Sequence, residues 1–239
     1  MNSKNTKLQE KEMQNLEIKP IAHIESQFHD KFGIPRQANL APSLMADIIF
    51  EPEFRNPDCI RGLECVSHIW ILWEFSEFRN KEWSPLVRPP RLGGNKKMGV
   101  FATRSPLRPN PLALSAVKIE NINLNTSNGP IITISGADIM NGTPIYDIKP
   151  YVPYADSISE ATSTLFTKPL QLEKVNFGKI STKKINPKTL KALEEILLQD
   201  PRPAYKKLGT DNYSFEFAEY HIEFYVENNI VNITKLIKI

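Results

Sequence analysis

The chain has 239 residues, of which 41% are hydrophobic and 24% are charged, and its formal net charge is +3. This is the composition of an ordinary globular protein that is long enough for one large domain, or for one domain with a small appendage. No apolar run approaches the roughly 18 residues of a membrane helix, and the polar start lacks a signal peptide. We therefore expect a cytoplasmic protein that does not enter a membrane.

The cysteine and histidine content argues against disulfides and metals. The only two cysteines, Cys59 and Cys65, lie six positions apart, and the four histidines at 23, 29, 68 and 221 show no metal-ligand spacing. This pattern predicts neither a disulfide framework nor a zinc site. We expect two reduced, partly buried thiols and no bound metal.

The N-terminal third predicts short strands joined by loops. Residues 1–16 are polar and form a tail, and apolar positions from Ile18 to Ile24 predict a first strand, for which Pro20 favours an edge position. Two further segments, 46–51 and the continuous apolar run 69–75, read as a short strand and as a central, fully buried strand. The remaining features are a loop at 31–37 and a helical turn at 57–62.

Residues 88–115, RPPRLGGNKKMGVFATRSPLRPNPLALS, are basic and rich in proline. No Asp or Glu occurs between Glu82 and Glu120, and five prolines exclude ordinary helix or sheet over most of the segment. A solvated basic loop is the plain alternative. Long irregular segments in compact domains are usually functional, so we predict a binding surface.

The segment that follows predicts antiparallel sheet. Apolar and polar residues alternate in 116–123 and again in 131–135, with turn residues between them, which predicts a β-hairpin. A further short strand is expected at 145–148. No βαβ rhythm appears and no GxGxxG follows a strand, which argues against a Rossmann fold. We predict a mainly β protein built on a small barrel.

The C-terminal part predicts a small α+β unit. Residues 155–182 resemble a linker, after which Asn186 and Pro187 predict the cap and first position of a helix that ends at Asp200. About three strands follow, within 213–239. We therefore divide the chain into a tail (1–16), a barrel (17–160) and a C-terminal α+β unit (161–239) that packs on the barrel or on a second subunit.

Three groups of residues could carry chemistry. The first group is Pro35, Arg36 and Gln37 on a stiff loop, which could instead be a plain exposed turn. The second is Ser67 and His68, just before the apolar run, where the histidine could instead simply bind a backbone carbonyl. The third group is the pair of loops 104–111 and 138–150, of opposite charge. It could be a structural ion pair or a site for a charged, polar small molecule.

Other catalytic signatures are absent from the sequence. There is no GxSxG motif, and the segment GGNKK at 93–97 lacks the upstream glycine and the Ser or Thr of a P-loop. A backbone anion site at 93–96 remains open as a weak signal.

Longer motifs resemble the TsaA-like family, and within it the tRNA (adenine-N6)-methyltransferases. The motifs are PRQ at 35–37, RGLE at 61–64, SH at 67–68, VRPPRLGGN at 87–95, GVFATRSPLRPNPLALS at 99–115 and DIMNGTPIYDIKPY at 138–151. The resemblance covers about residues 18–160 and continues in DPRPAYKK at 200–207. It implies a TsaA-like β-barrel that binds S-adenosylmethionine (SAM) and acts as a homodimer.

The implied substrate is the threonylcarbamoyl-modified adenosine 3′ of the anticodon, methylated on N6. Carried over position by position, the cofactor site comprises Pro35, Arg36, Gln37, Ser67, His68, Arg104, Leu114, Asp138, Ile139, Met140 and Asn141. The family's version of the last loop is expected to have Asp where this chain has Asn141. A contact through a carboxylate is therefore in doubt there, whereas one through the backbone is not.

Methyl transfer is an in-line displacement in which positioning supplies most of the rate, and a base is needed only to remove the N6 proton. We hypothesise that Asp147 or Asp200 is this base, with Tyr205 as an orienting or stacking partner; Trp83 is a second stacking candidate. The anticodon stem-loop would be bound by basic residues, namely Arg88, Arg91, Lys96, Lys97, Arg108, Lys149 and Arg202. The alternatives are a non-catalytic RNA-binding module and a methyltransferase for a small metabolite.

Overall fold

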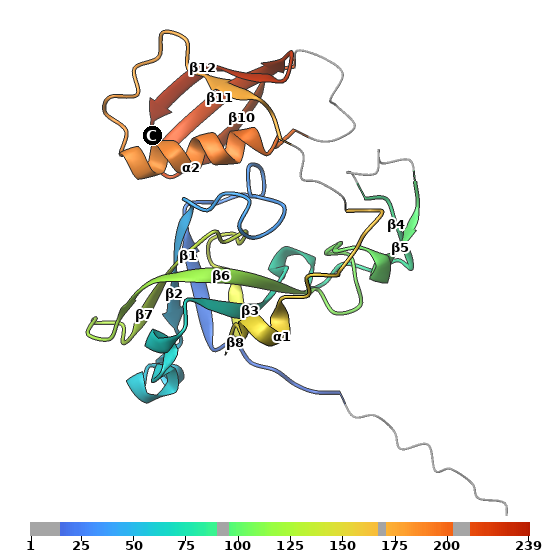
Figure 1. Cartoon of the computed structure of the whole chain (residues 1–239), viewed down its shortest axis with the longest axis vertical. Helices are drawn as coiled ribbons and strands as arrows, with labels where there is room; N and C mark the ends of the chain where they lie inside the picture. Colours follow the sequence, from blue (N-terminus) through green and yellow to red (C-terminus); the bar gives the residue numbers. More distant parts are fainter. Residues whose placement is uncertain (1–14, 90–95, 167–170, 203–210) are drawn as a thin grey trace, which may run out of the picture.

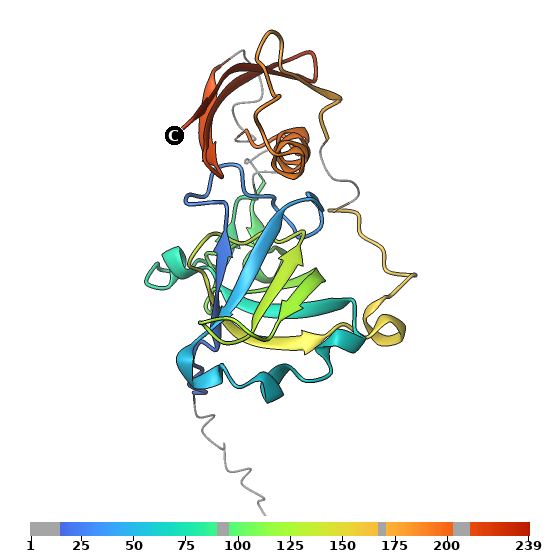
Figure 2. The ribbon, with the colours of Figure 1, turned by 90° about the vertical axis from the view of Figure 1, so that its left-hand side faces the viewer.

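The structure is a computed structural model that describes residues 15–89, 96–166, 171–202 and 211–239. The chain folds as a β-barrel with a smaller α+β unit stacked on one end of it (Figure 1). Turned by a quarter, the same arrangement shows helix α2 against the concave face of the C-terminal sheet, with both next to the barrel (Figure 2).

The barrel is closed by antiparallel strands in the order β1-β2-β7-β6-β3-β8. Their bounds are β1 Ala22–Ser26, β2 Met45–Phe50, β3 His68–Glu74, β6 Leu112–Asn123, β7 Ile131–Ser135 and β8 Pro144–Pro150. Inward-facing branched residues such as Ile24, Ile48, Ile71 and Ile134 fill the interior, as expected for strands with a period of two. The predicted barrel and its hairpin are thus confirmed.

Several short elements lie outside the barrel wall. They are the turns η1 Pro52–Phe54, η2 Pro57–Ile60, η3 Leu63–Cys65, η4 Ser76–Phe78 and η6 Val100–Ala102, the helix α1 Pro153–Asp156, and the two-stranded ribbon of β4 Leu86–Val87 and β5 Met98–Gly99. We call β4, β5 and η6 the arm, together with Arg88, Lys96 and Lys97, which flank the two strands. The arm projects to one side of the barrel (Figure 1). Among its described residues, the basic segment 88–115 therefore contains one short strand, β5, and the 3₁₀ turn η6, and it enters β6 at Leu112.

Three details differ from the sequence predictions. β1 pairs with both β2 and β8 and is not an edge strand, because Pro20 precedes the strand and removes none of its hydrogen bonds. β3 is central but not fully buried, because in a closed barrel alternate side chains such as Trp70 and Leu72 face outward. Cys59 and Cys65 are exposed, since both lie on short 3₁₀ turns at the barrel surface.

The C-terminal unit consists of α2 Pro187–Leu198 and a sheet in the order β10-β11-β12-β9. Its strands are β9 Lys174–Asn176, β10 Tyr213–Phe217, β11 Tyr220–Glu227 and β12 Ile230–Lys238. As predicted, Asn186 caps α2: its side-chain oxygen accepts a hydrogen bond from Lys188 N. The short parallel strand β9, inside the expected linker, was missed.

Loops of the barrel contribute to the apolar core of the C-terminal unit, which is separate from the core inside the barrel. Phe28, Ala41 and Leu44 from loops of the barrel are buried in the C-terminal cluster, and the Phe28 and Phe217 rings lie 5.3 Å apart. Polar contacts add to this: Ser43 N and Oγ donate to Glu195, and Ala218 N donates to Gln27 O. Of the two predicted partners of the C-terminal unit, the barrel or a second subunit, the barrel is the one that it contacts in this structure.

Gly33 is a sensitive point of this contact. Its φ is +94°, and an added Cβ would lie 2.8 Å from the Phe215 ring, whereas Gly62, at a φ of +96°, has open space around it. We expect Gly62→Ala to lower the free energy of unfolding by about 1 kcal/mol through backbone strain alone. Gly33→Ala should cost about 2–3 kcal/mol because overpacking is added. Urea unfolding of both variants measures the difference; equal losses would show that Phe215 accommodates the methyl group.

Candidate active site

A groove of about 1050 Å³ runs along the outside of β3 and the start of β6. It is bounded by the loop at 31–39, by η4, by the arm and by the loop at 138–143. Its lining combines aromatic rings, proline and leucine side chains with a few charged groups. A large apolar cleft with a few converging polar groups is typical of a binding site for a small molecule.

One wall of the groove carries two arginines and a glutamine. Gln37 Oε1 accepts a hydrogen bond from the Arg104 guanidinium, which joins the loop at 31–39 to the segment after the arm. Arg36 Nη2 donates to the carbonyl of Arg202 at 3.0 Å and so links the same loop to the C-terminal unit. The PRQ loop and the basic segment, 67 residues apart in sequence, are therefore side by side.

A chain of hydrogen bonds forms part of the groove floor. Trp73 Nε1 donates to Ser115 Oγ at 2.9 Å, and Ser115 Oγ donates to Asp138 Oδ1 at 2.6 Å. Burial raises the pKa of the Asp138 carboxyl, while the Ser115 hydroxyl and the Arg104 charge oppose this effect. Asp138 is therefore a largely buried carboxyl that is held by neighbouring donors and lies within reach of the Arg104 charge.

Glu74 supports the groove at the end of β3. Its side chain is 6% exposed and accepts hydrogen bonds from Arg79 Nε at 2.8 Å, Arg79 Nη2 at 2.6 Å and Tyr146 Oη at 2.5 Å. The Arg79 guanidinium lowers the pKa of Glu74, and burial only partly offsets it. These bonds fix η4, whose Glu77 also pairs with Lys31 across the groove.

A pH-dependent loss of stability follows from Glu74. Because its pKa is lower in the folded than in the unfolded state, its contribution is present above pH ~4.3 and is lost as the pH falls through the folded value. We expect Glu74→Gln to lower the free energy of unfolding by about 1–2 kcal/mol at pH 7, a figure discounted because Arg79 is half exposed. This loss should become smaller as the pH falls below ~4.3. Urea titrations at pH 7 and pH 3.5 measure it. Glu53→Gln, which removes an exposed pair with Lys19, is the control and should change little.

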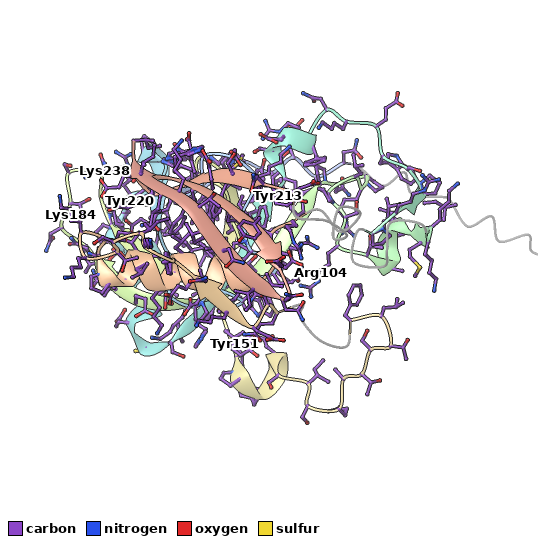
Figure 3. All side chains as sticks on the ribbon, turned by 90° about the horizontal axis from the view of Figure 1, so that it is seen from above. Arg104, Tyr151, Lys184, Tyr213, Tyr220 and Lys238 are labelled. Carbon is purple, nitrogen blue, oxygen red and sulfur yellow. The ribbon has the colours of Figure 1, made fainter. Side chains whose placement is uncertain are left out.

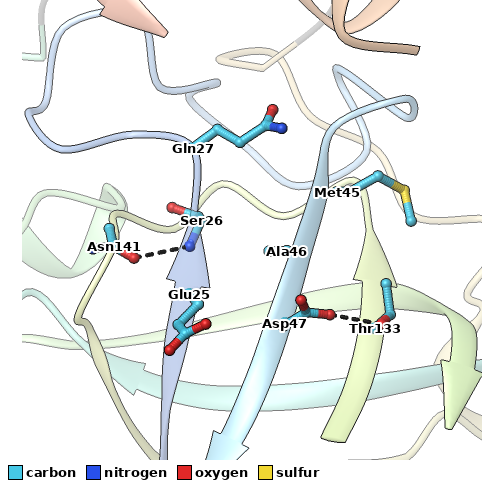
Figure 4. Close-up of a pocket in the computed structure, with 8 residues that line it drawn as sticks. All are labelled: Glu25, Ser26, Gln27, Met45, Ala46, Asp47, Thr133 and Asn141. Atoms are coloured by element: carbon cyan, nitrogen blue, oxygen red, sulfur yellow. Dashed lines mark hydrogen bonds between the residues drawn. The ribbon is translucent and has the colours of Figure 1, made fainter. Parts of the chain in front are cut away.

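The loop at 138–141 separates the groove from a second, smaller hollow. Asp138 and Met140 line the groove, Ile139 is buried in the barrel core, and Asn141 turns to the other side. There Asn141 Oδ1 accepts from Ser26 N at 3.0 Å, and Asp47 accepts from Thr133 Oγ1 at 2.6 Å (Figure 4). The hollow has a volume of about 400 Å³, and all four residues of these two hydrogen bonds line it.

Comparison with known proteins decides which family the chain belongs to. The sequence profile of the tRNA-methyltransferase O N-terminal domain matches residues 23–157, and that of the TrmO C-terminal domain matches residues 173–239. The chain belongs to the tRNA-methyltransferase O family. Both matches together cover the barrel and the C-terminal unit, so the resemblance seen in the sequence motifs extends over both folded parts.

Individual proteins that are similar to this chain point to the same family. The tRNA (adenine(37)-N6)-methyltransferase of Escherichia coli is 38% identical over 202 residues, which cover 82% of this chain and 86% of the relative. A Pseudomonas aeruginosa protein named a putative S-adenosylmethionine-dependent methyltransferase is 38% identical over 197 residues, or 80% of this chain and 83% of that one. A crystal structure of TrmO from P. aeruginosa superposes with a TM-score of 0.75 at 29% identity, over 96% of this chain and all of that one.

Most of the cofactor residues expected from the tRNA-methyltransferase O resemblance come together in the groove. Those that line it are Pro35, Arg36, Gln37, Arg104, Leu114, Asp138 and Met140. Ser67 and His68 do not: they lie at the other end of β3, where Ser67 Oγ and His68 Nδ1 are 2.8 Å apart and Tyr151 N donates to His68 O. Their proposed role stays a prediction.

The predicted catalytic carboxylates lie outside the groove lining. Asp147, on the outer face of β8, pairs with Lys149 at 2.8 Å. Asp200 is buried and accepts from Arg202 Nε at 2.8 Å and Nη2 at 3.2 Å, just beyond α2. Tyr205 lies outside the described residues. Their catalytic role stays a prediction.

The predicted RNA-binding residues are spread over three regions. Arg88, Lys96 and Lys97 are exposed on the arm, and Arg108 lines the groove. Lys149 is exposed on β8, whereas Arg202 is buried in its pair with Asp200. Arg91 lies outside the described residues. Of the described residues in this set, only Arg108 lines the groove itself.

Several groove residues were missed by sequence reasoning. Trp70, Leu72, Glu74, Phe78 and Phe101 all line it. The residues of β3 were read as core because the apolar run is continuous; only the alternation of the barrel wall turns Trp70 and Leu72 outward. Over the part of the chain that the structure describes, no cluster of three or more His, Cys, Asp or Glu could hold a metal, and no helix is long and apolar enough to cross a membrane.

Proposed function

We propose that the chain is a SAM-dependent tRNA methyltransferase that methylates N6 of the threonylcarbamoyl-modified adenosine 3′ of the anticodon. The observation that carries the proposal is a groove of mixed polarity beside a basic arm, in a member of the tRNA-methyltransferase O family. The E. coli relative, named for methylation of adenine 37, supports the same reaction. We place the enzyme in the cytoplasm, where tRNA is modified.

The groove has the chemistry needed to hold SAM, which supplies a methyl group carried on a sulfonium. Its volume of about 1050 Å³ suffices for a ligand of that size, and its lining offers a guanidinium for a carboxylate, Asp138 as a counter-charge, and apolar side chains for an adenine. Arg104 and Gln37 would orient the ligand, while Leu114 and Met140 would exclude water from it.

A homodimer is part of the proposal. Ser67 and His68 belong to the cofactor residues that the resemblance implies, and they do not line the groove of their own chain. In the proposed homodimer, these two residues would face the groove of the other subunit. Light scattering of the purified protein tests the assembly, and the SAM affinity of Ser67→Ala and His68→Ala tests the residues.

The arm gives the tRNA a place to bind. Lys96 and Lys97 are exposed, and among the described residues no carboxylate pairs with either of them. Each phosphate contact that is lost should lower the slope of log K against log salt by about 0.7–0.9. We expect Lys96→Ala with Lys97→Ala to weaken tRNA binding and to flatten this slope by about 1.5, measured by filter binding from 50 to 200 mM salt.

A double variant of two other exposed lysines, Lys183→Ala with Lys184→Ala, removes the same charge. Lys184 lies on the far side of the molecule from Arg104 in the view from above (Figure 3). This control should leave the slope unchanged. If both double variants lower the slope equally, the arm holds no special place in tRNA binding.

Mass spectrometry of tRNA nucleosides tests the reaction itself. In a strain that lacks the gene, the methyl group should be missing from the threonylcarbamoyl-adenosine nucleoside and should return when the gene is restored. Purified protein should transfer the methyl from SAM to that tRNA. A non-catalytic RNA-binding module would bind tRNA and leave the nucleoside unchanged, and an enzyme for a small metabolite would leave the tRNA of the deletion strain fully methylated.

A further inference from the structure

Phe101 has an unusual place for an apolar ring. It is 76% exposed, although it lines the rim of the groove, and neither the sequence motifs nor the predicted site residues gave it a role. A large aromatic side chain that is left in water forgoes the stabilisation that burial would give. Exposure of an aromatic ring at the mouth of a binding groove therefore points to contact with a ligand.

The backbone that carries Phe101 is firmly held on both sides. Val100 is buried, and its N–H donates to Pro85 O at 2.9 Å; Thr103 is also buried, and its Oγ1 donates to Val100 O at 2.9 Å. Thr103 N donates to the same carbonyl at 3.2 Å. These hydrogen bonds hold the 3₁₀ turn η6 in place, so the backbone at Phe101 is fixed although its ring is exposed.

The surroundings of the ring are positively charged. Arg104 is exposed three residues further on, Arg108 lines the same groove, and Lys96 and Lys97 lie just before it on the arm. Among the described residues, none of these four cations pairs with a carboxylate. A flat apolar ring amid unpaired cations complements an unpaired nucleobase, whose face is a π-system and whose backbone carries phosphates.

We propose that Phe101 is a stacking platform for an unpaired base of the anticodon loop where the RNA enters the groove. This inference rests on the proposed function, because it takes an RNA substrate as given. The arm would bind the phosphates, and the Phe101 ring would stack on a base and hold the target nucleotide at the mouth of the groove. Phe101 is a positioning residue here, since it contacts the RNA and takes no part in the proton transfer.

The test compares Phe101→Leu, which keeps an apolar side chain but has no π-face, with Phe101→Trp, which keeps one. The probe is an anticodon stem-loop with 2-aminopurine next to the target adenosine, whose fluorescence falls when the base stacks. With Phe101→Leu, we expect the quenching to disappear and the stem-loop to bind about tenfold more weakly, the size of one stacking contact. With Phe101→Trp, both the quenching and the affinity for the stem-loop should be retained.

Phe166→Leu is the matched control, because Phe166 is also exposed but does not line the groove; it should leave RNA binding unchanged. Wild-type quenching and affinity in Phe101→Leu would overturn the inference while leaving the proposed function intact. A wild-type protein that binds no tRNA would instead overturn the proposed function and the inference with it. If Phe101→Leu changes the subunit number in light scattering, the ring belongs to a subunit contact, and the inference is wrong.

Discussion

Replacing the base that accepts the N6 proton should lower the turnover number by about 10²–10⁴-fold, the usual contribution of a general base. We expect this of either Asp147→Asn or Asp200→Asn, with a smaller loss for Tyr205→Phe. The N6 lone pair is delocalised into the ring and the carbamoyl group, so the nitrogen needs an acceptor for its proton as it attacks. Methyl transfer at saturating SAM and tRNA measures the effect, and wild-type turnover in all three variants would exclude all three residues.

The surroundings of Asp200 require one more control. Its carboxylate is 5% exposed and binds Arg202 through two hydrogen bonds, so Asp200→Asn also disturbs a buried ion pair. Arg202→Leu breaks the same pair and leaves the carboxylate in place. If Asp200 only stabilises the fold through this ion pair, both variants should show lower activity and a lower melting temperature together. If it is the base, Asp200→Asn should lose turnover at an unchanged KM for tRNA.

Removing the guanidinium of Arg104 should weaken SAM binding by about 10–100-fold. Arg104 lies in the groove, is held by Gln37, and has no carboxylate within ion-pair distance among the described residues, so its charge is available to an anionic ligand. A hydrogen bond to a charged group contributes about 1.5–3 kcal/mol, which corresponds to this range. Calorimetry with SAM should show the loss in Arg104→Leu and a partial recovery in Arg104→Lys.

A second arginine serves as the control for Arg104. Arg61 is exposed on the barrel surface and pairs with Asp58, away from the groove, so Arg61→Leu should leave SAM affinity unchanged. A normal SAM affinity in Arg104→Leu, combined with a raised KM for tRNA, would assign Arg104 to the RNA and not to the cofactor. That result would also leave Gln37 without its proposed role in orienting SAM.

Local rules predicted the secondary structure well where one residue type decides the conformation. Asn186 and Pro187 marked the start of α2, and the alternating residues of β6, β7 and β11 marked their strands. Local rules failed where a segment becomes a strand only because another strand pairs with it. The three residues of β9 form a strand only because Ile230–Asn232 of β12 offer a free parallel edge, and no pattern within 155–182 signals this.

The candidate site was predicted in part. Motifs alone identified the PRQ loop, Arg104 and the loop at 138–141, and the structure brings most of their residues into one groove. Trp70, Glu74 and Phe101 could not be found this way. Whether a side chain of β3 points into the barrel or into the groove depends on closure of the sheet, and whether Phe101 is exposed depends on what packs around η6.

Sequence patterns alone predicted most of the strands, the capped helix, the basic proline-rich segment and the family, because each of these is encoded in neighbouring residues or in ordered motifs. Three features became visible only in the folded chain: the PRQ loop lies against Arg104, Phe28 and Leu44 complete the core of the C-terminal unit, and Ser67 and His68 lie away from the groove. These are contacts between residues far apart in the chain, and they depend on how the barrel closes and where the second unit docks, which no local pattern specifies.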